Sequence, residues 1–368
     1  MRLAVSGAGI PSAVRLVYME DGKGEVRKDM PYIFDVGDHC IYSVNVKMPE
    51  KAGLVWYYFE LETERGMVYY GNNSKQLGGI GEMCFNSPSN SYQITVYNED
   101  YKTPDWFKTG IAYQIFVDRF CNGNENGEFL GNRTDIIKRN WGEQPFYKAE
   151  QFGGEYKAND FFGGNLKGVI KKLPYLKDLG ISVIYLNPIF KAYSNHKYDT
   201  GDYETIDPMF GDEETFKELC SKAKEMGIRI ILDGVFNHTG SNSRYFNKYG
   251  EYDSVGAYQS KESPYYTWFR FMDWPDVYES WWGMTTLPQI EEHSEECRKY
   301  LLSDKDAIVK RWIKNGASGW RLDVVDELPG FFVKELRENV KKADKDAVII
   351  GEVWEDASNK SAYGERRE

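Results

Sequence analysis

The chain has 368 residues, enough for two domains or for one large domain with an appendage. Its net charge of −11 and its lack of a basic cluster argue against nucleic acid as a partner. No apolar run approaches the ~20 residues of a membrane span, and the start of the chain lacks the sustained apolar segment of a signal peptide. We therefore expect neither a membrane nor a nucleic acid among its partners.

The cysteine and aromatic content of the chain narrows the class of protein further. Five scattered cysteines, none in a CxxC pair, predict reduced thiols and a cytoplasmic protein rather than a disulfide framework or a zinc site. Aromatic residues make up 15% of the chain. Many of them will be core, but flat aromatic rings also suit a sugar, because its ring faces are apolar.

Residues 1–102 have the pattern of short strands separated by turns. Segments such as 53–63 and 91–100 are rich in Val, Ile and Tyr, and clusters of Gly, Asn, Pro and Ser lie between such segments. Nothing in this region has a helical pattern. We predict an N-terminal β-sandwich domain over residues 1–102.

From residue 103 onward, strands and helices alternate. Helices are predicted over residues 165–180, 212–227, 294–316 and 331–346. Strands are predicted over residues 111–117, 181–188, 228–233, 319–323 and 347–352. Three of the helices end at a glycine that is followed at once by an apolar strand. This alternation indicates a parallel sheet.

The carboxyl ends of these strands carry polar residues in an apolar context. One strand ends with Arg321 and Asp323, which share a face because they are two residues apart. A structural ion pair would explain these two alone. However, Glu352 ends the next strand, and Asp233 and His238 follow an earlier one. Because the carboxyl ends of parallel strands meet at one edge, acids at consecutive strand ends favour an active site.

Three of these strand ends carry a recognisable resemblance. The segments "ILDGVFNH", "GWRLDVVDE" and "IIGEVWED" resemble, in order, the first three signatures of the α-amylase family of glycoside hydrolases. The segments "YQIFVDRF" and "NHKYDTGDY" resemble its neopullulanase, cyclomaltodextrinase and maltogenic amylase branch. The resemblance runs from about residue 100 to about residue 356. It implies a β-sandwich followed by a (β/α)8 barrel of the TIM type, of which residues 103–368 would supply about the first five strands, with a long loop at 239–293.

The resemblance also implies a reaction. The chain would belong to a retaining hydrolase that cleaves α-1,4 or α-1,6 glucosidic bonds of maltodextrins, cyclodextrins or pullulan through a covalent glycosyl-enzyme. Asp323 would be the nucleophile and Glu352 the general acid and base. Arg321 would hold Asp323 ionised, because an adjacent guanidinium lowers the pKa of a carboxyl group.

Further residues match the sugar-binding positions of the branch. These are Tyr198 as a stacking platform, His196 and His238 as hydroxyl binders, Asp233 as a brace of the site, and Trp354 and Glu327 on the leaving-group side. For each, ordinary packing or a structural role is the alternative. The long loop holds Trp281 and Trp282, which could be one buried ring and one sugar platform or two core residues. This loop departs from the branch at "LPQIEE", so the preferred glucan stays open.

A metal site is implied as well. Asn122, Asn124, Asn126 and Asn165 match the calcium loop of the branch, whose ligands are hard oxygen atoms. Asn124 and Asn165 stand where the branch has Asp, so a metal-free turn is an equal alternative. We expect no organic cofactor.

Two other functions stay open at this point. The same scaffold could serve a transglycosylase or an α-glucosidase, since water and sugar compete for one intermediate. A catalytically incompetent glucan-binding fragment is the other alternative. The presence of Arg321, Asp323 and Glu352 together argues against it, because binding alone requires none of them.

The end of the chain raises a last expectation. Only sixteen residues follow Glu352, whereas a further strand–helix unit takes roughly 30 residues. An eight-stranded barrel would then need its remaining half from another segment or chain, and the first and fifth strands would lie at open edges. The fourth family signature, Asn-His-Asp, is missing. We expect this chain alone to be poorly soluble and almost inactive. The partners we expect are an α-glucan oligosaccharide, the missing barrel half, and a second copy bound through the N-terminal domain.

Overall fold

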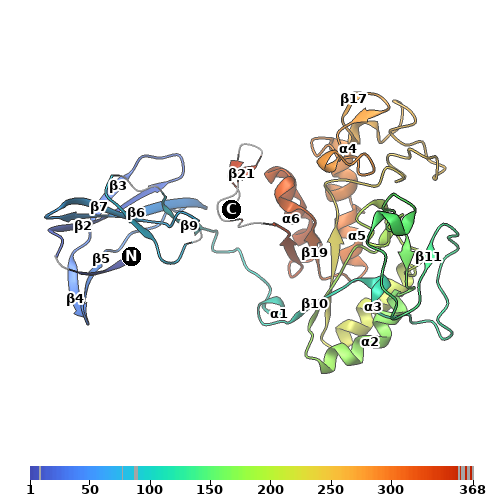
Figure 1. The fold of residues 1–368 in the computed structure, drawn as a ribbon, viewed down its shortest axis with the longest axis horizontal. Coiled ribbons are helices and arrows are strands. Elements are labelled where there is room, and N and C mark those ends of the chain that lie inside the picture. Colours follow the sequence, from blue (N-terminus) through green and yellow to red (C-terminus); the bar gives the residue numbers. More distant parts are fainter. Residues whose placement is uncertain are drawn as a thin grey trace. The chain divides into compact units, whose positions relative to one another are not determined.

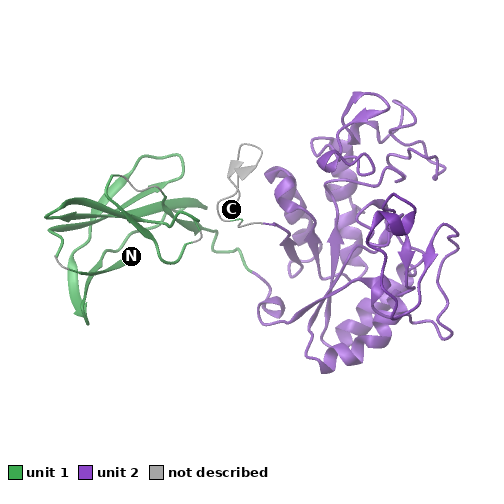
Figure 2. Ribbon diagram, in the orientation of Figure 1, with its two compact units in different colours: residues 1–102, 355–368 green, residues 103–354 purple. Residues whose placement is uncertain are grey.

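A computed structural model describes residues 1–7, 10–76, 78–86 and 90–354, together with residues 357, 361–362 and 365–366. The chain forms two compact units, one of residues 1–102 with 355–368 and one of residues 103–354 (Figure 2). Within the residues described, none of the helices has both the length and the apolar character needed to cross a membrane.

The first unit consists of two antiparallel sheets. Its strands are β1 (Arg2–Ser6), β2 (Ala13–Glu20), β3 (Val26–Asp29), β4 (Tyr32–Val36), β5 (His39–Ser43), β6 (Gly53–Thr63), β7 (Gly66–Gly71), β8 (Glu82–Cys84) and β9 (Tyr92–Val96). One sheet has the order β1-β5-β4, and the other has the order β3-β2-β6-β7-β8 with β9 also paired to β6. Leu16 and Phe59 of the larger sheet share a buried core with Tyr42 of the smaller sheet. The predicted β-sandwich is therefore confirmed.

The second unit is built on a parallel sheet of five strands. In spatial order they are β10 (Ala112–Ile115), β13 (Val183–Leu186), β16 (Arg229–Gly234), β19 (Gly319–Leu322) and β20 (Val348–Gly351). The helices beside them are α2 (Leu166–Asp178), α3 (Glu213–Glu225), α5 (Ile308–Lys314) and α6 (Gly330–Ala343) (Figure 1). In the described part of the chain, β10 and β20 lie at the two edges of this sheet. The strand order is that of the predicted barrel half.

Shorter elements complete the second unit. They are the helices α1 (Asp105–Lys108) and α4 (Glu295–Arg298) and the strands β11 (Ile137–Lys138), β12 (Asp160–Phe161), β14 (Phe190–Ala192), β15 (Thr200–Ile206), β17 (Phe271–Asp273) and β18 (Val277–Tyr278). Two short strands near the end of the chain, β21 (Ser361–Ala362) and β22 (Glu365–Arg366), pair with each other.

The helix predicted over residues 294–316 is interrupted. After α4 the chain makes a π-helical turn at Lys299–Ser303 and resumes as α5 only at Ile308. Leu301 and Leu302 within this turn are both fully buried. A π-helical turn interrupts the hydrogen-bond ladder of an α-helix, so the predicted helix is divided into two.

The two faces of the parallel sheet have different roles. Alternate residues such as Ile184, Leu232 and Leu322 pack into the core that the helices cover. Because side chains alternate along a strand, Tyr185 and Arg321 lie on the opposite face. The polar residues of the site therefore come from the face that does not pack against the helices.

Candidate active site

Arg321, on β19, contacts three carboxylates: Asp233, Asp323 and Glu352. We call these four residues the Arg321 cluster. Its Nη1 donates to both oxygens of Asp233, at 3.1 and 3.0 Å, and to Oδ1 of Asp323 at 2.9 Å. Its Nη2 lies 2.6 Å from Oε1 of Glu352. One guanidinium thus gathers the acids of three neighbouring strand ends around a single point.

The backbone around Asp323 adds to this arrangement. Asp323 donates its backbone N–H to the carbonyl of Gly234 at 3.1 Å. The next residue, Val324, has φ 40°, a left-handed conformation that is rare for a β-branched residue. Its N–H donates to Oε2 of Glu352 at 3.2 Å. The strained turn therefore links the end of β19 to the carboxylate that follows β20.

Asp233 is the most buried acid of the Arg321 cluster. Besides Arg321, its Oδ2 accepts hydrogen bonds from the hydroxyls of Tyr185 and Tyr198, the latter at 3.2 Å. Burial raises the pKa of Asp233 to about 6, against the opposing effect of Arg321. Asp233 thus contacts both Arg321 and Tyr198, and its role as a brace of the site stays a prediction.

The surroundings of Asp323 favour its ionisation less than the sequence analysis expected. Burial first, and then the neighbouring Asp233, raise the pKa of Asp323 to about 7. Arg321 lowers this pKa, as expected, but does not outweigh burial and Asp233. Arg321 shares its charge among three carboxylates, and the Asp323 side chain is only 10% exposed, so desolvation outweighs the attraction.

His196 and Tyr198 lie on a loop between β14 and β15 that is held by a buried ion pair. Lys197 between them is fully buried, and its Nζ lies 2.7 Å from Oδ2 of Asp207. Lys197 also has φ 62°. The Nδ1 atom of His196 accepts the backbone N–H of Tyr198 at 3.1 Å. Burial lowers the pKa of His196, which favours the neutral imidazole.

His238 follows β16 and is also buried. Its ring stacks on Trp281 with centroids 5.2 Å apart and planes 27° apart. Burial lowers the pKa of His238 to about 4. Within the described residues, its Nε2 has no hydrogen-bond partner. A neutral imidazole nitrogen without a partner at a cavity can donate a hydrogen bond to a ligand hydroxyl or accept one from it, depending on the tautomer.

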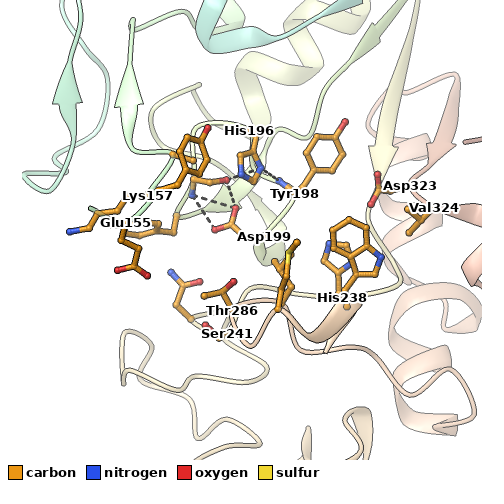
Figure 3. Close-up of a pocket in the computed structure, with 18 of the residues that line it drawn as sticks. Glu155, Lys157, His196, Tyr198, Asp199, His238, Ser241, Thr286, Asp323 and Val324 are labelled. Atoms are coloured by element: carbon orange, nitrogen blue, oxygen red, sulfur yellow. Dashed lines mark hydrogen bonds between the residues drawn. The ribbon is translucent and has the colours of Figure 1, made fainter. Parts of the chain in front are cut away.

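These side chains line a cavity of about 950 Å³. The predicted site residues among its lining are Arg321, Asp323, Glu352, Tyr198, His196, His238 and Trp354. Figure 3 shows Asp323 and His238 across the cavity from Glu155 and Lys157. Asp233 and Glu327 are not among the described lining residues, because they lie behind Tyr198 and the loop tryptophans respectively.

The sequence analysis missed part of the lining. Glu155 and Lys157 come from an irregular segment before β12, and Asp199 comes from the loop of His196. Asp199 accepts the backbone N–H of Ser194 at 3.1 Å. The motif "NHKYD" contains Asp199 and could have indicated it, whereas Glu155 and Lys157 carry no local signal.

The asparagine loop is hydrogen-bonded to itself. Oδ1 of Asn165 accepts the backbone N–H groups of Gly123 and Gly168, and Oδ1 of Asn122 accepts that of Asn124. The amide groups of Asn122 and Asn124 donate to the carbonyl of Glu128 at 3.1 and 2.7 Å, and that of Asn126 donates to the carboxylate of Glu128. Oδ1 of Asn122 and Oδ1 of Asn165 are thus engaged by backbone N–H groups, and the calcium site implied by the resemblance stays a prediction.

Most of the second unit matches a known protein family. The family described as alpha amylase, catalytic domain, matches residues 114–368. The chain is 42% identical over 332 residues to an amylopullulanase of Thermoanaerobacterium saccharolyticum, an alignment that covers 83% of this chain and 26% of the relative. It is 41% identical over 266 residues to a cyclomaltodextrinase of Thermoanaerobacter pseudethanolicus, covering 69% of this chain and 41% of the relative. The chain thus spans less than half the length of these curated relatives.

A solved structure with the same architecture is the type III pullulan hydrolase from Thermococcus kodakarensis. It matches with a TM-score of 0.63 and 30% sequence identity, over 100% of this chain and 60% of that one. The match extends over both units, so the order of β-sandwich and parallel α/β unit is shared.

Proposed function

This chain belongs to the α-amylase family of glycoside hydrolases, and from that premise we propose that its cavity cleaves the α-glucosidic bonds of α-glucan oligosaccharides with retention of configuration. The observation that carries the proposal is the Arg321 cluster, in which Asp323 and Glu352 contact one guanidinium at the cavity. Such a pair of acids matches the two carboxyl groups that retaining glycosidases use.

In the first step, an oxygen of ionised Asp323 attacks the anomeric carbon of the bound sugar. The bond from that carbon to the glycosidic oxygen breaks as the bond to Asp323 forms, and Glu352 gives its proton to the departing oxygen. Arg321 contacts both carboxyl groups, and its positive charge stabilises each of them in the ionised state.

In the second step, water takes the place of the departed sugar. Glu352, now ionised, removes a proton from the water, whose oxygen attacks the anomeric carbon. The bond to Asp323 breaks, and both carboxyl groups return to their initial states. An incoming sugar hydroxyl could replace water in this step, which is how transglycosylation would occur.

The surrounding residues suit the binding of sugar. Tyr198 presents a ring beside the Arg321 cluster, and His196 and His238 line the same cavity as neutral imidazoles. A cavity of about 950 Å³ is large enough for more than one sugar ring. Since relatives carry the names amylopullulanase and cyclomaltodextrinase, pullulan and cyclodextrins are the first substrates to test, beside linear maltodextrins.

The test is product analysis with the full-length gene product. Incubation with maltodextrin, cyclodextrin and pullulan should release shorter oligosaccharides, and proton NMR of fresh product should show the α-anomer first. First release of the β-anomer would contradict the retaining mechanism. Absence of cleavage on all three glucans would contradict the proposed function.

We also propose a cytoplasmic location. It is supported by the scattered cysteines, none of which stands in a CxxC pair; cell fractionation tests it. The homodimer through residues 1–102 is tested by light scattering on the purified protein with and without this unit.

A further inference from the structure

Glu327 has an unusual pair of partners. It lies in a single 3₁₀ turn, Val325–Glu327, shortly after β19. Its Oε2 accepts the indole N–H of Trp281 at 2.9 Å, and its Oε1 accepts the indole N–H of Trp282 at 2.9 Å. These tryptophans precede Glu327 by 46 and 45 residues. One carboxylate therefore fastens the long loop to the segment that carries Asp323.

The two fastened rings contact a third. Trp354 meets Trp282 with centroids 5.4 Å apart and planes 69° apart, and Trp281 with centroids 6.3 Å apart and planes 82° apart. We call Trp281, Trp282 and Trp354 the tryptophan cluster. Trp281 and Trp354 line the cavity. Trp282 is 64% and Trp354 58% exposed, so large apolar ring surfaces remain open to a ligand.

The backbone conformation of Trp282 indicates that its surroundings hold this residue in place. Trp282 has φ 51°, a left-handed conformation that a bulky residue adopts only where its surroundings hold it. The hydrogen bond to Glu327 and the ring contacts with Trp354 and Trp281 restrain its side chain. Without the carboxylate, only the ring contacts would hold the exposed indole.

The position of the tryptophan cluster indicates which part of the substrate it would bind. Trp354 follows Glu352 by two residues, and Glu352 is the group proposed to protonate the departing oxygen. Because Trp354 belongs to the segment that carries Glu352, we assign the rings to the part of the glucan that leaves and Tyr198 to the part that stays. Indole rings pack on the apolar faces of sugar rings.

We propose that Glu327 is a positioning residue that orients the tryptophan cluster for the leaving-group sugars of an α-glucan, and that it acts through the indoles instead of contacting substrate. This inference rests on the proposed function. It reassigns Glu327, which the sequence placed in contact with the leaving-group side of the substrate. It also gives the two loop tryptophans different roles. Trp281 packs on His238, whereas Trp282 presents an exposed ring face.

Two substitutions test this role in the full-length gene product. Glu327→Gln keeps the size of the side chain, but its amide nitrogen cannot accept an indole N–H, so one of the two bonds is lost. Trp282→Phe keeps an aromatic ring and removes the donor. Glu296→Gln, an exposed carboxylate on α4 outside the lining, is the matched control.

The readout is a pair of substrates. Maltohexaose has sugars on the leaving-group side, whereas α-maltosyl fluoride leaves that side empty. Both substitutions should raise KM for maltohexaose by roughly three- to tenfold, the worth of one hydrogen bond, with kcat within about twofold. Kinetics on α-maltosyl fluoride should stay unchanged.

Several results would overturn the inference. Equal losses on both substrates would mean that Glu327 supports the reacting centre or the fold. An unchanged KM for maltohexaose in both variants would mean that the indoles bind no sugar. If the unmutated protein cleaves no α-glucan, the proposed function fails by itself, and titration of indole fluorescence with maltohexaose then decides. Weaker binding in Glu327→Gln would support the positioning role, and no binding by the unmutated protein would overturn it.

Discussion

Members of the Arg321 cluster and of the tryptophan cluster line the same cavity, but the two clusters come from different parts of the fold. The charged groups sit at the ends of β16, β19 and β20, whose ladder pairs Asp233 with Arg321 directly. Two of the tryptophans sit on a long loop, held by the carboxylate of Glu327. The Asp233 side chain is fully buried, whereas Trp282 is 64% exposed.

This difference has an energetic consequence. A buried charge that loses its partner keeps the cost of its desolvation, so a change in the Arg321 cluster should be severe. An exposed ring that loses one hydrogen bond remains partly in place, so a change in the tryptophan cluster should be mild. We therefore expect substitutions at the strand ends to impair the reaction itself and substitutions in the loop to impair substrate binding.

Asp323→Asn should have the largest effect. The amide cannot form the covalent intermediate, so kcat on maltodextrin should fall by at least about 10³-fold. The fold should survive, because the remaining oxygen of Asn can still accept from Arg321. Steady-state kinetics and the melting temperature check both parts. Near-normal hydrolysis would remove Asp323 from the role of nucleophile.

Glu352→Gln should have an effect that depends on the leaving group. Loss of the proton donor should slow maltodextrin cleavage by about 10²- to 10⁴-fold. The first step with α-maltosyl fluoride should be affected far less, because fluoride departs with little protonation. Burst kinetics on both substrates separate the two steps. Equal losses in the first step would argue against the acid role.

Asp233→Asn should shift the pH dependence. Asp323 must be ionised to attack, and with its pKa near 7 the value of kcat/KM should rise with pH through about 7. The negative charge of Asp233 raises that pKa, so its removal should move the acidic limb to lower pH, by on the order of one unit. The exposed Asp273→Asn on β17 serves as the control. A limb that moves to higher pH would contradict this account of the Arg321 cluster.

Calcium removal should have the smallest effect. Oδ1 of Asn122 and Oδ1 of Asn165 already accept backbone N–H groups, and an ion stabilises a fold only as far as it binds. Chelation with EDTA should therefore change the melting temperature by less than about 1 °C. A larger drop that added calcium restores would show that the loop rearranges to bind the ion.

Much of the fold and of the Arg321 cluster could be predicted from the sequence. Apolar runs marked the strands β13, β16 and β19, and so did the glycines that end the helices before them. Both signals are local in the sequence. The polar residues at the strand ends could be grouped, since parallel strands present their carboxyl ends at one edge. The interruption of the helix predicted over 294–316 was missed, because the apolar pattern of this segment is compatible with one continuous helix.

Other features depended on contacts between residues far apart in the chain. The sequence by itself determined that Arg321, Asp323 and Glu352 would meet, because strand periodicity places them on one face and at one edge. It could not determine the pKa of Asp323, which follows from desolvation and from how many carboxylates share one guanidinium. Nor could it assign Glu327 to Trp281 and Trp282, because a hydrogen bond across some 45 residues leaves no periodic trace in the sequence. Only the tertiary structure decided these, since burial and long-range pairing are properties of the folded surroundings and not of the local pattern.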